Sequence, residues 1–148
     1  METAQKLWSF SEIDLGESPV ALDWSACGRW LAVINVNSSV TVVDTVSETA
    51  LKSWIAHDDG ALALTWHPTL PLFATSCQGG IVKFWYLEND QTINKQSELV
   101  IDSTAGNGWV ELLKWSPDGQ HLAIGADNSC LLYTSPSPRD RTRSRMPS

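Results

Sequence analysis

The segment Leu62–Ser76 reads LALTWHPTLPLFATS, and two other segments of the chain can be laid over it. They are Val20–Ile34, VALDWSACGRWLAVI, and Glu111–Gly125, ELLKWSPDGQHLAIG. In each segment a tryptophan is followed by a turn and then by a run rich in apolar residues. The tryptophans fall at positions 24, 66 and 115, at intervals of 42 and 49 residues. A self-similar period of this length indicates a repeat architecture.

Each period consists of short apolar runs separated by turn residues. Trp30–Ile34 and Leu72–Ser76 are continuous runs of the kind found in strands that are buried on both faces. Glu98–Asp102 is expected to form the outer strand of the second period, and Gly79-Gly80 supplies a hairpin turn. With four strands per period and no helical periodicity, the sequence predicts an all-β fold. Its expected form is a β-propeller, in which four-stranded antiparallel blades stack around an axis.

These residues resemble the WD-repeat family. Ala56-His57 stands where that family usually has Gly-His, and Trp85-Tyr86 ends a strand where it has Trp-Asp. The resemblance covers Pro19 to about Ser129, nearly the whole body of the chain. It implies a non-catalytic platform that binds protein partners through loops on one face of a ring.

The resemblance also implies a structural hydrogen-bond network of His, Ser or Thr, Asp and Trp. In the second repeat this network maps onto His57, Thr75 and Trp85, while Gly79 occupies the turn position that usually carries the Asp. In the first repeat Val43-Asp44 replaces Trp-Asp, so the repeats are divergent. The loss of one such hydrogen bond costs roughly 0.5–1.5 kcal/mol, which a repeat array tolerates.

A second propeller class is also compatible with part of the pattern. Trp115–Gly119 reads WSPDG, a motif that TolB-like and peptidase-associated propellers carry in their blades. The alternative function is therefore the propeller part of a larger enzyme whose catalytic domain lies outside this chain. His57 and Trp85 at their family positions, and an N-terminus without a secretory pattern, favour the WD-repeat interpretation. The untruncated reading frame discriminates between the two.

Composition and charge restrict the partners. The chain carries 17 Asp and Glu against 10 Lys and Arg, a net charge of -7. Such an acidic body repels phosphate backbones, so direct nucleic-acid binding is not expected. No apolar run approaches the roughly 20 residues of a membrane helix, so no membrane partner is expected. Three cysteines without a CxxC pair favour a reducing compartment, and the predicted localisation is cytoplasmic.

The sharpest candidate for chemistry is His57-Asp58-Asp59, which has the look of a metal-ligating His-Asp pair. The repeat places His67 on a surface turn and His121 within a strand of another blade, so the three histidines do not converge. Cys27 and Cys77 lack a neighbouring histidine or basic residue that would activate a thiol. No catalytic, metal or cofactor site is therefore predicted, and the chain is expected not to be an enzyme.

Tryptophans divide into repeating and non-repeating ones. The three repeating tryptophans, at positions 24, 66 and 115, are expected in the core. Trp109 aligns instead with Ser18 and Gly60, at the loop that enters an inner strand, and is a candidate partner-binding anchor. The alternative is that it packs on the loop 103–108. Asp59, in the loop between the first two blades, is the other candidate for partner binding.

The predicted propeller domain comprises residues 1–129. Its blades are expected at about 18–56, 57–105 and 106–129, the third one truncated, with residues 5–13 as a ring-closing strand. Closed propellers have about four to eight blades, so the ring is incomplete. Repeats that cannot cover their apolar faces are unstable alone, and this chain is expected to self-associate through unpaired blade faces.

The chain ends in CLLYTSPSPRDRTRSRMPS, residues 130–148. This stretch resembles the translation of a sequencing-library adapter and is interpreted as a non-native tail. Ser129–Thr134 nevertheless alternates in polarity, and an open sheet edge accepts almost any extended segment. A short strand is therefore predicted at Ser129–Thr134, followed by an extended, exposed segment at 135–148.

Overall fold

The computed structural model of the chain describes residues 11–89, 91–101, 108–126 and 129–134, and these contain eleven strands and no helix. The strands form three antiparallel sheets in the orders β1-β2-β3-β4, β5-β6-β7-β8 and β11-β10-β9. The all-β prediction is confirmed. The strands are β1 Pro19–Trp24, β2 Trp30–Asn35, β3 Ser39–Asp44, β4 Thr49–Ile55, β5 Ala61–Trp66, β6 Leu72–Cys77, β7 Ile81–Glu88, β8 Thr92–Val100, β9 Val110–Trp115, β10 His121–Ala126 and β11 Ser129–Thr134.

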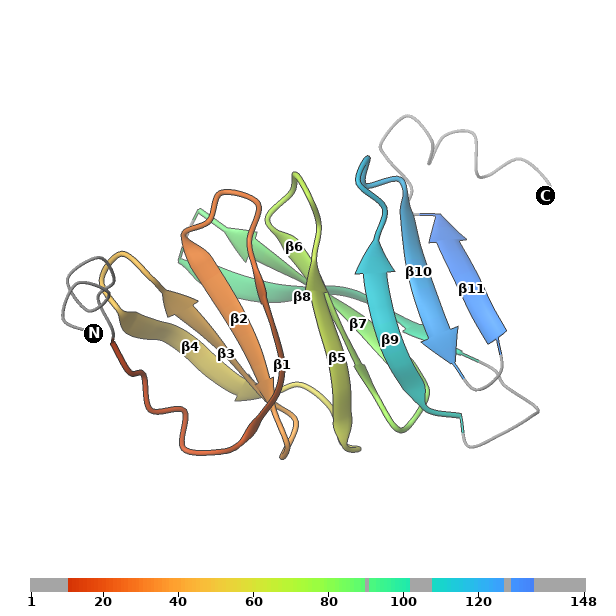
Figure 1. Ribbon diagram of the computed structural model, residues 1–148, viewed down its shortest axis with the longest axis horizontal. Coiled ribbons are helices and arrows are strands. Elements are labelled where there is room, and N and C mark those ends of the chain that lie inside the picture. The colour runs from red at the N-terminus through yellow and green to blue at the C-terminus, as the bar shows by residue number, and fades with distance from the viewer. Residues whose placement is uncertain (1–10, 90, 102–107, 127–128, 135–148) are drawn as a thin grey trace, which may run out of the picture.

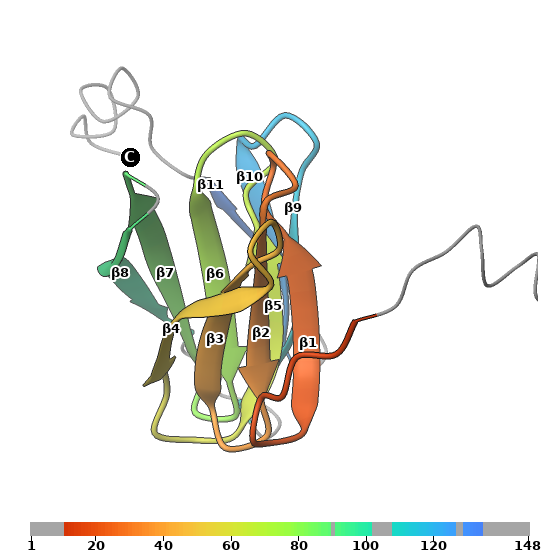
Figure 2. The same cartoon turned by 90° about the vertical axis from the view of Figure 1, so that its left-hand side faces the viewer.

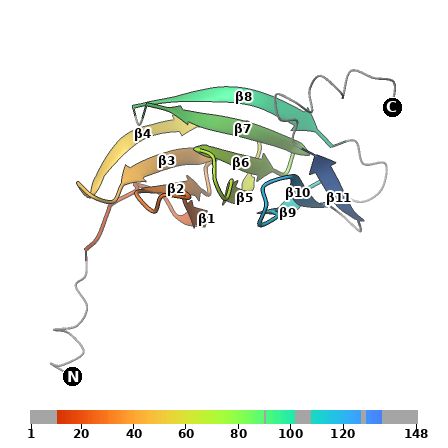
Figure 3. The same cartoon turned by 90° about the horizontal axis from the view of Figure 1, so that it is seen from above.

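The three sheets lie face to face in an open row (Figure 1). Seen from above, β1, β5 and β9 line one side of the row, while β4 and β8 line the other (Figure 3). The view along the row shows how strongly the outer strand β4 is rotated from the inner strands of its sheet (Figure 2). This is the predicted arrangement of twisted blades in an incomplete ring.

The repeated turn after each tryptophan is built from the same hydrogen bonds in the first and third sheets. The Ser25 hydroxyl accepts the Trp30 N–H at 3.1 Å, and the Ser116 hydroxyl accepts the His121 N–H at 3.0 Å. Both turns place a glycine at positive φ, with Gly28 at 78° and Gly119 at 74°. A residue without a Cβ adopts this conformation at little cost, which explains the glycine in each turn.

The core lies between the sheets. One cluster joins the first and second sheets, and the other joins the second and third. The first cluster contains Trp30, Ala32, Ile34, Val40, Val42, Ala56, Ala61, Leu64, Trp66, Phe73, Trp85, Leu87 and Ile93. The second contains Leu72, Ala74, Val82, Phe84, Val110, Trp115, Leu122, Ile124 and Ala126. Each sheet therefore depends on its neighbour for burial of its apolar residues.

The prediction that all three repeating tryptophans are core residues is wrong for one of them. Trp66 and Trp115 are 4% and 6% exposed, whereas Trp24 is 52% exposed. The tryptophan of each sheet packs on the sheet before it. Trp24 belongs to the first sheet and lies on its outward face, so none of the described sheets precedes it.

The predicted surface position of His67 is also wrong, since this side chain is only 5% exposed. Its Nδ1 accepts the backbone N–H groups of Thr69 and Leu70 at 3.1 and 3.0 Å. The Nε2 atom therefore carries the proton and donates to the Gly119 carbonyl at 3.1 Å. The ring also packs against Trp115, with centroids 4.8 Å apart. His67 thus links the turn of the second sheet to the turn of the third.

The outer strand of the second sheet begins earlier than predicted. The expected strand was Glu98–Asp102, whereas β8 starts at Thr92 and pairs with β7 along its length. A turn in which the Gln91 N–H bonds to the Glu88 carbonyl extends the β7–β8 hairpin. Apart from the buried Ile93, the residues from Thr92 to Glu98 are polar and exposed, so the sequence shows no apolar run there.

The strand predicted at the start of the tail is confirmed. β11 spans Ser129–Thr134 and pairs antiparallel with β10, from Ser129 opposite Ala126 to Thr134 opposite His121. The predicted exposed segment 135–148 lies outside the described residues. So does most of the predicted closing strand 5–13, of which residues 11–13 are described and belong to no strand.

The two equivalent glycines provide a matched test of the His67 link. A Cβ at Gly119 would clash with the His67 ring, whereas nothing lies within 4 Å of a Cβ at Gly28. Gly28→Ala should cost only the left-handed backbone penalty of roughly 1–2 kcal/mol. Gly119→Ala should cost a further 1 kcal/mol or more (about 1–3 for an overpacked site), measured as the free energy of unfolding in urea. Equal losses would show that the His67 contact does not hold the third sheet.

Candidate functional site

Three buried polar side chains meet between the first and second sheets. His57 lies in the β4–β5 connection, Thr75 on β6 and Trp85 on β7. The Nε2 atom of His57 is 2.8 Å from the Thr75 hydroxyl oxygen, and the Trp85 Nε1–H donates to the same oxygen at 2.9 Å. The network thereby fastens the connecting loop to the middle of the second sheet.

The electrostatic surroundings keep His57 neutral. Burial, and after it the charge of Lys83, lower the pKa of His57 from its ordinary value of 6.5 to about 4. The Lys83 ammonium is held beside the network, because it donates to the Ala56 carbonyl at 2.7 Å. A neutral His57 can accept the Thr75 hydroxyl proton at Nε2, since the Thr75 oxygen already accepts from Trp85.

The position of the missing aspartate is occupied from another loop. A side chain at Gly79 would clash with the carboxylate of Asp59. The Asp59 backbone is in turn anchored, because its carbonyl accepts a hydrogen bond from the Ser38 hydroxyl. Among the described residues no partner is found for the buried Nδ1 of His57. An acidic group from a neighbouring loop thus lies at this position without forming the third hydrogen bond of the network, to His57 Nδ1.

The first sheet has an apolar version of this network. By the repeat, Val33 and Val43 correspond to Thr75 and Trp85, and both valines are buried, at 3% and 1% exposure. Replacing both partners of a buried hydrogen bond by apolar groups is close to neutral. The network therefore has a structural role at one interface, that between the first and second sheets.

The loops at one edge of the row form a repeated, hydrogen-bonded rim (lower edge of Figure 1). The Val36 N–H bonds to the Ser18 carbonyl, and 42 residues later the Gln78 N–H bonds to the Gly60 carbonyl, both at 2.8 Å. We define the loop rim as residues 36–38, 56–60, 78–80 and 108–109. Its backbone is held in place, which suits a recognition surface on a rigid scaffold.

Both candidate partner-binding residues belong to the loop rim. Asp59 and the adjacent Asp58 are exposed. Trp109 is half-buried and has interactions of its own, so it is not a fully exposed anchor. The loop 103–108, on which the alternative interpretation packs Trp109, lies almost entirely outside the described residues.

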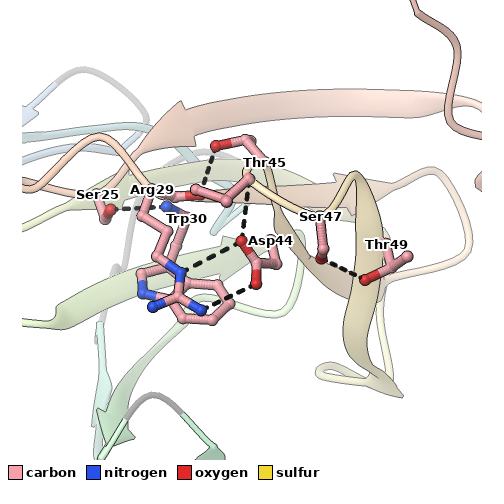
Figure 4. Close-up of polar contacts among 8 residues, drawn as sticks. Ser25, Arg29, Trp30, Asp44, Thr45, Ser47 and Thr49 are labelled. Carbon is pink, nitrogen blue, oxygen red and sulfur yellow. Dashed lines mark hydrogen bonds and ion pairs between the residues drawn. The ribbon is translucent and has the colours of Figure 1, made fainter.

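At the opposite edge of the first sheet, Asp44 forms an ion pair with Arg29 (Figure 4). The guanidinium Nη2 donates to the carboxylate at 3.0 Å, and the same group lies 4.5 Å from the ring centroid of Trp30. The hydrogen bond from Arg29 holds the pKa of Asp44 below its usual value. Asp44 is the aspartate of the Val43-Asp44 pair that stands in place of Trp-Asp, and it joins the end of β3 to the β1–β2 turn.

No group of three or more potential metal ligands occurs in the described parts of the chain. His57, His67 and His121 lie in the β4–β5 connection, the β5–β6 turn and the start of β10. The described segments contain no helix, and hence none that could cross a membrane.

Two family profiles match the chain. The profile of the anaphase-promoting complex subunit 4 WD40 domain matches residues 2–69. The profile of the WD domain, G-beta repeat, matches residues 100–134. The second match ends with β11, so it includes the first five residues of the stretch that resembles adapter sequence.

The chain is similar to much longer curated proteins. It is 26% identical over 136 residues to the activating molecule in BECN1-regulated autophagy protein 1A of Danio rerio, covering 89% of this chain and 10% of that protein. It is 30% identical over 107 residues to protein HIR1 of Cryptococcus neoformans, covering 70% of this chain and 12% of that protein. The chain thus spans about a tenth of the length of these relatives.

Solved structures share the fold at low identity. A chain of the mitotic checkpoint complex superposes with a TM-score of 0.64 at 16% identity, covering 78% of this chain and 35% of that one. The β-propeller domain of Myceliophteria thermophila Cps50 (Swd1) gives 0.63 at 11%, covering 78% and 39%. The fold is that of a β-propeller. With the profile matches, it shows that the chain belongs to the WD-repeat family.

Burial of His57 makes stability depend on pH. Because its pKa is about 4 in the folded chain and 6.5 ordinarily, the unfolded chain binds the proton first as pH falls. The contribution is complete above about pH 6.5 and is lost towards pH 4, by up to about 3 kcal/mol at ~1.36 kcal/mol per pKa unit. In urea denaturation from pH 7.5 to 4.5, His57→Gln should be less stable than wild type at pH 7.5. The gap should narrow at pH 4.5, and a constant gap would contradict the assignment.

Thr75→Val should leave two buried nitrogens, on His57 and Trp85, without their partner. The expected loss of unfolding free energy is about 1–3 kcal/mol. Thr41→Val is the control: Thr41 is also a buried strand residue, but its hydroxyl lies 3.1 Å from the hydroxyl of the exposed Ser53 rather than between two buried nitrogens. A thermal or urea melt should show the larger loss for Thr75→Val. Equal losses would mean that the network adds nothing to the second sheet.

Proposed function

We propose that this chain is a non-catalytic protein-interaction platform whose partner-binding surface is the loop rim. WD-repeat propellers generally act as scaffolds that bind protein partners, and the family membership supports this role. The partners of the whole protein are part of the same proposal, since the chain spans only about a tenth of the length of these relatives.

The observation that carries the proposal is the construction of the loop rim. Backbone hydrogen bonds from Val36 to Ser18 and from Gln78 to Gly60 fix the loops, while Asp58 and Asp59 remain exposed. A rigid backbone that presents exposed acidic groups lowers the entropy cost of binding. The partner that suits this surface is a protein segment with Lys or Arg opposite the two aspartates.

The further parts of the proposal concern location and self-association. A cytoplasmic location is supported by three cysteines without a CxxC pair, and cell fractionation tests it. Association between copies is supported by exposed apolar residues on the outer sheets, including Leu22 and Leu132. The alternative, a propeller within a larger enzyme, is supported by the WSPDG motif of Trp115–Gly119, and the untruncated reading frame tests it.

The test compares two charge-removing variants at opposite edges of the row. Asp58→Asn/Asp59→Asn neutralises the loop rim, and Glu48→Gln removes one exposed charge in the β3–β4 turn. Each immobilised chain is incubated with a lysate of the source cells, and retained proteins are quantified by mass spectrometry. At least one protein retained by wild type and by Glu48→Gln should be lost from the double variant. Equal retention by all three chains, with unchanged melting curves, would contradict the rim as the binding surface.

A further inference from the structure

The three described sheets all stack in the same direction, so the two faces of each sheet differ. We call the face with the repeating tryptophan the leading face, and the opposite face the trailing face. Trp66, on the leading face of the second sheet, packs on the trailing face of the first sheet. Trp115, on the leading face of the third sheet, packs in the same way on the trailing face of the second. Figure 1 shows the first and third sheets at the two ends of the row.

The leading face of the first sheet presents an apolar row. Val20, Leu22 and Trp24 alternate along β1 and are 44%, 56% and 52% exposed. Between them, Ala21 and Asp23 point the other way, and Asp23 accepts the Trp66 N–H at 2.8 Å. One side of β1 therefore contributes to the interface with the second sheet. Its other side presents an exposed apolar surface of the kind that packs on a trailing face.

The trailing face of the third sheet is apolar and hollowed. Leu112 and Leu132 are each 70% exposed, and Cys130 is exposed as well. They lie on one face, because Gly125 pairs with both Leu112 and Cys130, and Ala123 pairs with Leu132. A hollow of about 580 Å³ lies on this sheet, and its lining includes Leu112, Lys114, Gly125 and Cys130. Its size is within the range of pockets that hold small organic molecules, so an indole fits.

An equivalent tryptophan already occupies the equivalent place inside the chain. Trp115 sits on the trailing face of the second sheet, where its Nε1–H donates to the Thr65 carbonyl at 3.3 Å and its ring lies 6.2 Å from Phe84. By the repeat, Lys114 corresponds to Thr65, and by strand pairing Leu132 corresponds to Phe84. The third sheet therefore offers the same acceptor and an apolar wall to an incoming tryptophan.

We propose that the occupant is a second copy of this chain, whose Trp24 enters the hollow at its Lys114 side, beside Leu132, in head-to-tail fashion. This rests on the self-association proposed above and specifies its geometry. Each copy has one leading and one trailing face, so two copies form two identical contacts and close a ring of six sheets. Six lies within the four to eight blades of closed propellers. Once the first contact exists the second is intramolecular, which favours the closed dimer over an open chain.

The first experiment is sedimentation velocity of the full chain in reducing buffer, over a hundredfold range of concentration. Wild type should show a monomer and a dimer and no larger species. Trp24→Glu and Leu132→Glu should each be monomeric, while Val46→Glu, in the β3–β4 turn at 77% exposure, should behave as wild type. Melting curves establish that each variant is folded. A monomeric wild type, a persisting dimer in Trp24→Glu, or growth beyond the dimer would overturn the proposal.

The second experiment distinguishes head-to-tail contact from contact between like faces. Trp24→Glu retains its trailing face and Leu132→Glu its leading face, so an equimolar mixture should form a dimer that neither forms alone. In wild type, alkylation of Cys130 by iodoacetamide should slow at least fivefold on dimer formation, while that of Cys27 should not change. Failure of the mixture to associate would contradict the head-to-tail contact. Neither result depends on Asp58 or Asp59, so the loop rim is tested separately.

Discussion

The contact between the leading face of one sheet and the trailing face of the sheet before it determines the rest of the structure. A twisted four-stranded sheet has no interior of its own, and both core clusters of this chain lie between sheets. The repeating tryptophan of a sheet is buried where another sheet covers it, as Trp66 and Trp115 show in contrast to Trp24. Stability is therefore a property of neighbouring pairs, as in other repeat proteins.

Apolar contact alone is not directional, and polar contacts across the interfaces select one register. Between the first and second sheets, Asp23 accepts the Trp66 N–H and Lys83 bonds to the Ala56 carbonyl. Between the second and third, Ser76 donates to the Val110 carbonyl at 2.8 Å, and His67 bonds to the Gly119 carbonyl. Each interface thus combines a non-specific apolar area with a few hydrogen bonds that form in one alignment.

The repeat made the strands and their order predictable, down to the bounds of β11, because strand formation depends on local alternation and on an open edge. Burial was less predictable. Trp24 and His67 were misplaced because an equivalent position in the sequence does not guarantee an equivalent neighbour in space. The resemblance identified His57, Thr75 and Trp85, but the approach of Asp59 to Gly79 joins two loops without a shared sequence pattern. The available signal for it was Gly79, which the sequence placed both in a hairpin turn and at the position of the missing Asp.

Equivalent positions on the first and second sheets differ in chemistry, which has a consequence for how such arrays diverge. Val33 and Val43 are buried apolar residues at the positions where the next repeat has Thr75 and Trp85 bonded to each other and, through Thr75, to His57. Because a face meets only one other face, a paired replacement at one junction leaves the other junctions undisturbed. A gene with repeats of this kind can exchange a polar junction for an apolar one by compensated mutations confined to two adjacent repeats. Sequence signatures can thus fade repeat by repeat while the backbone geometry persists.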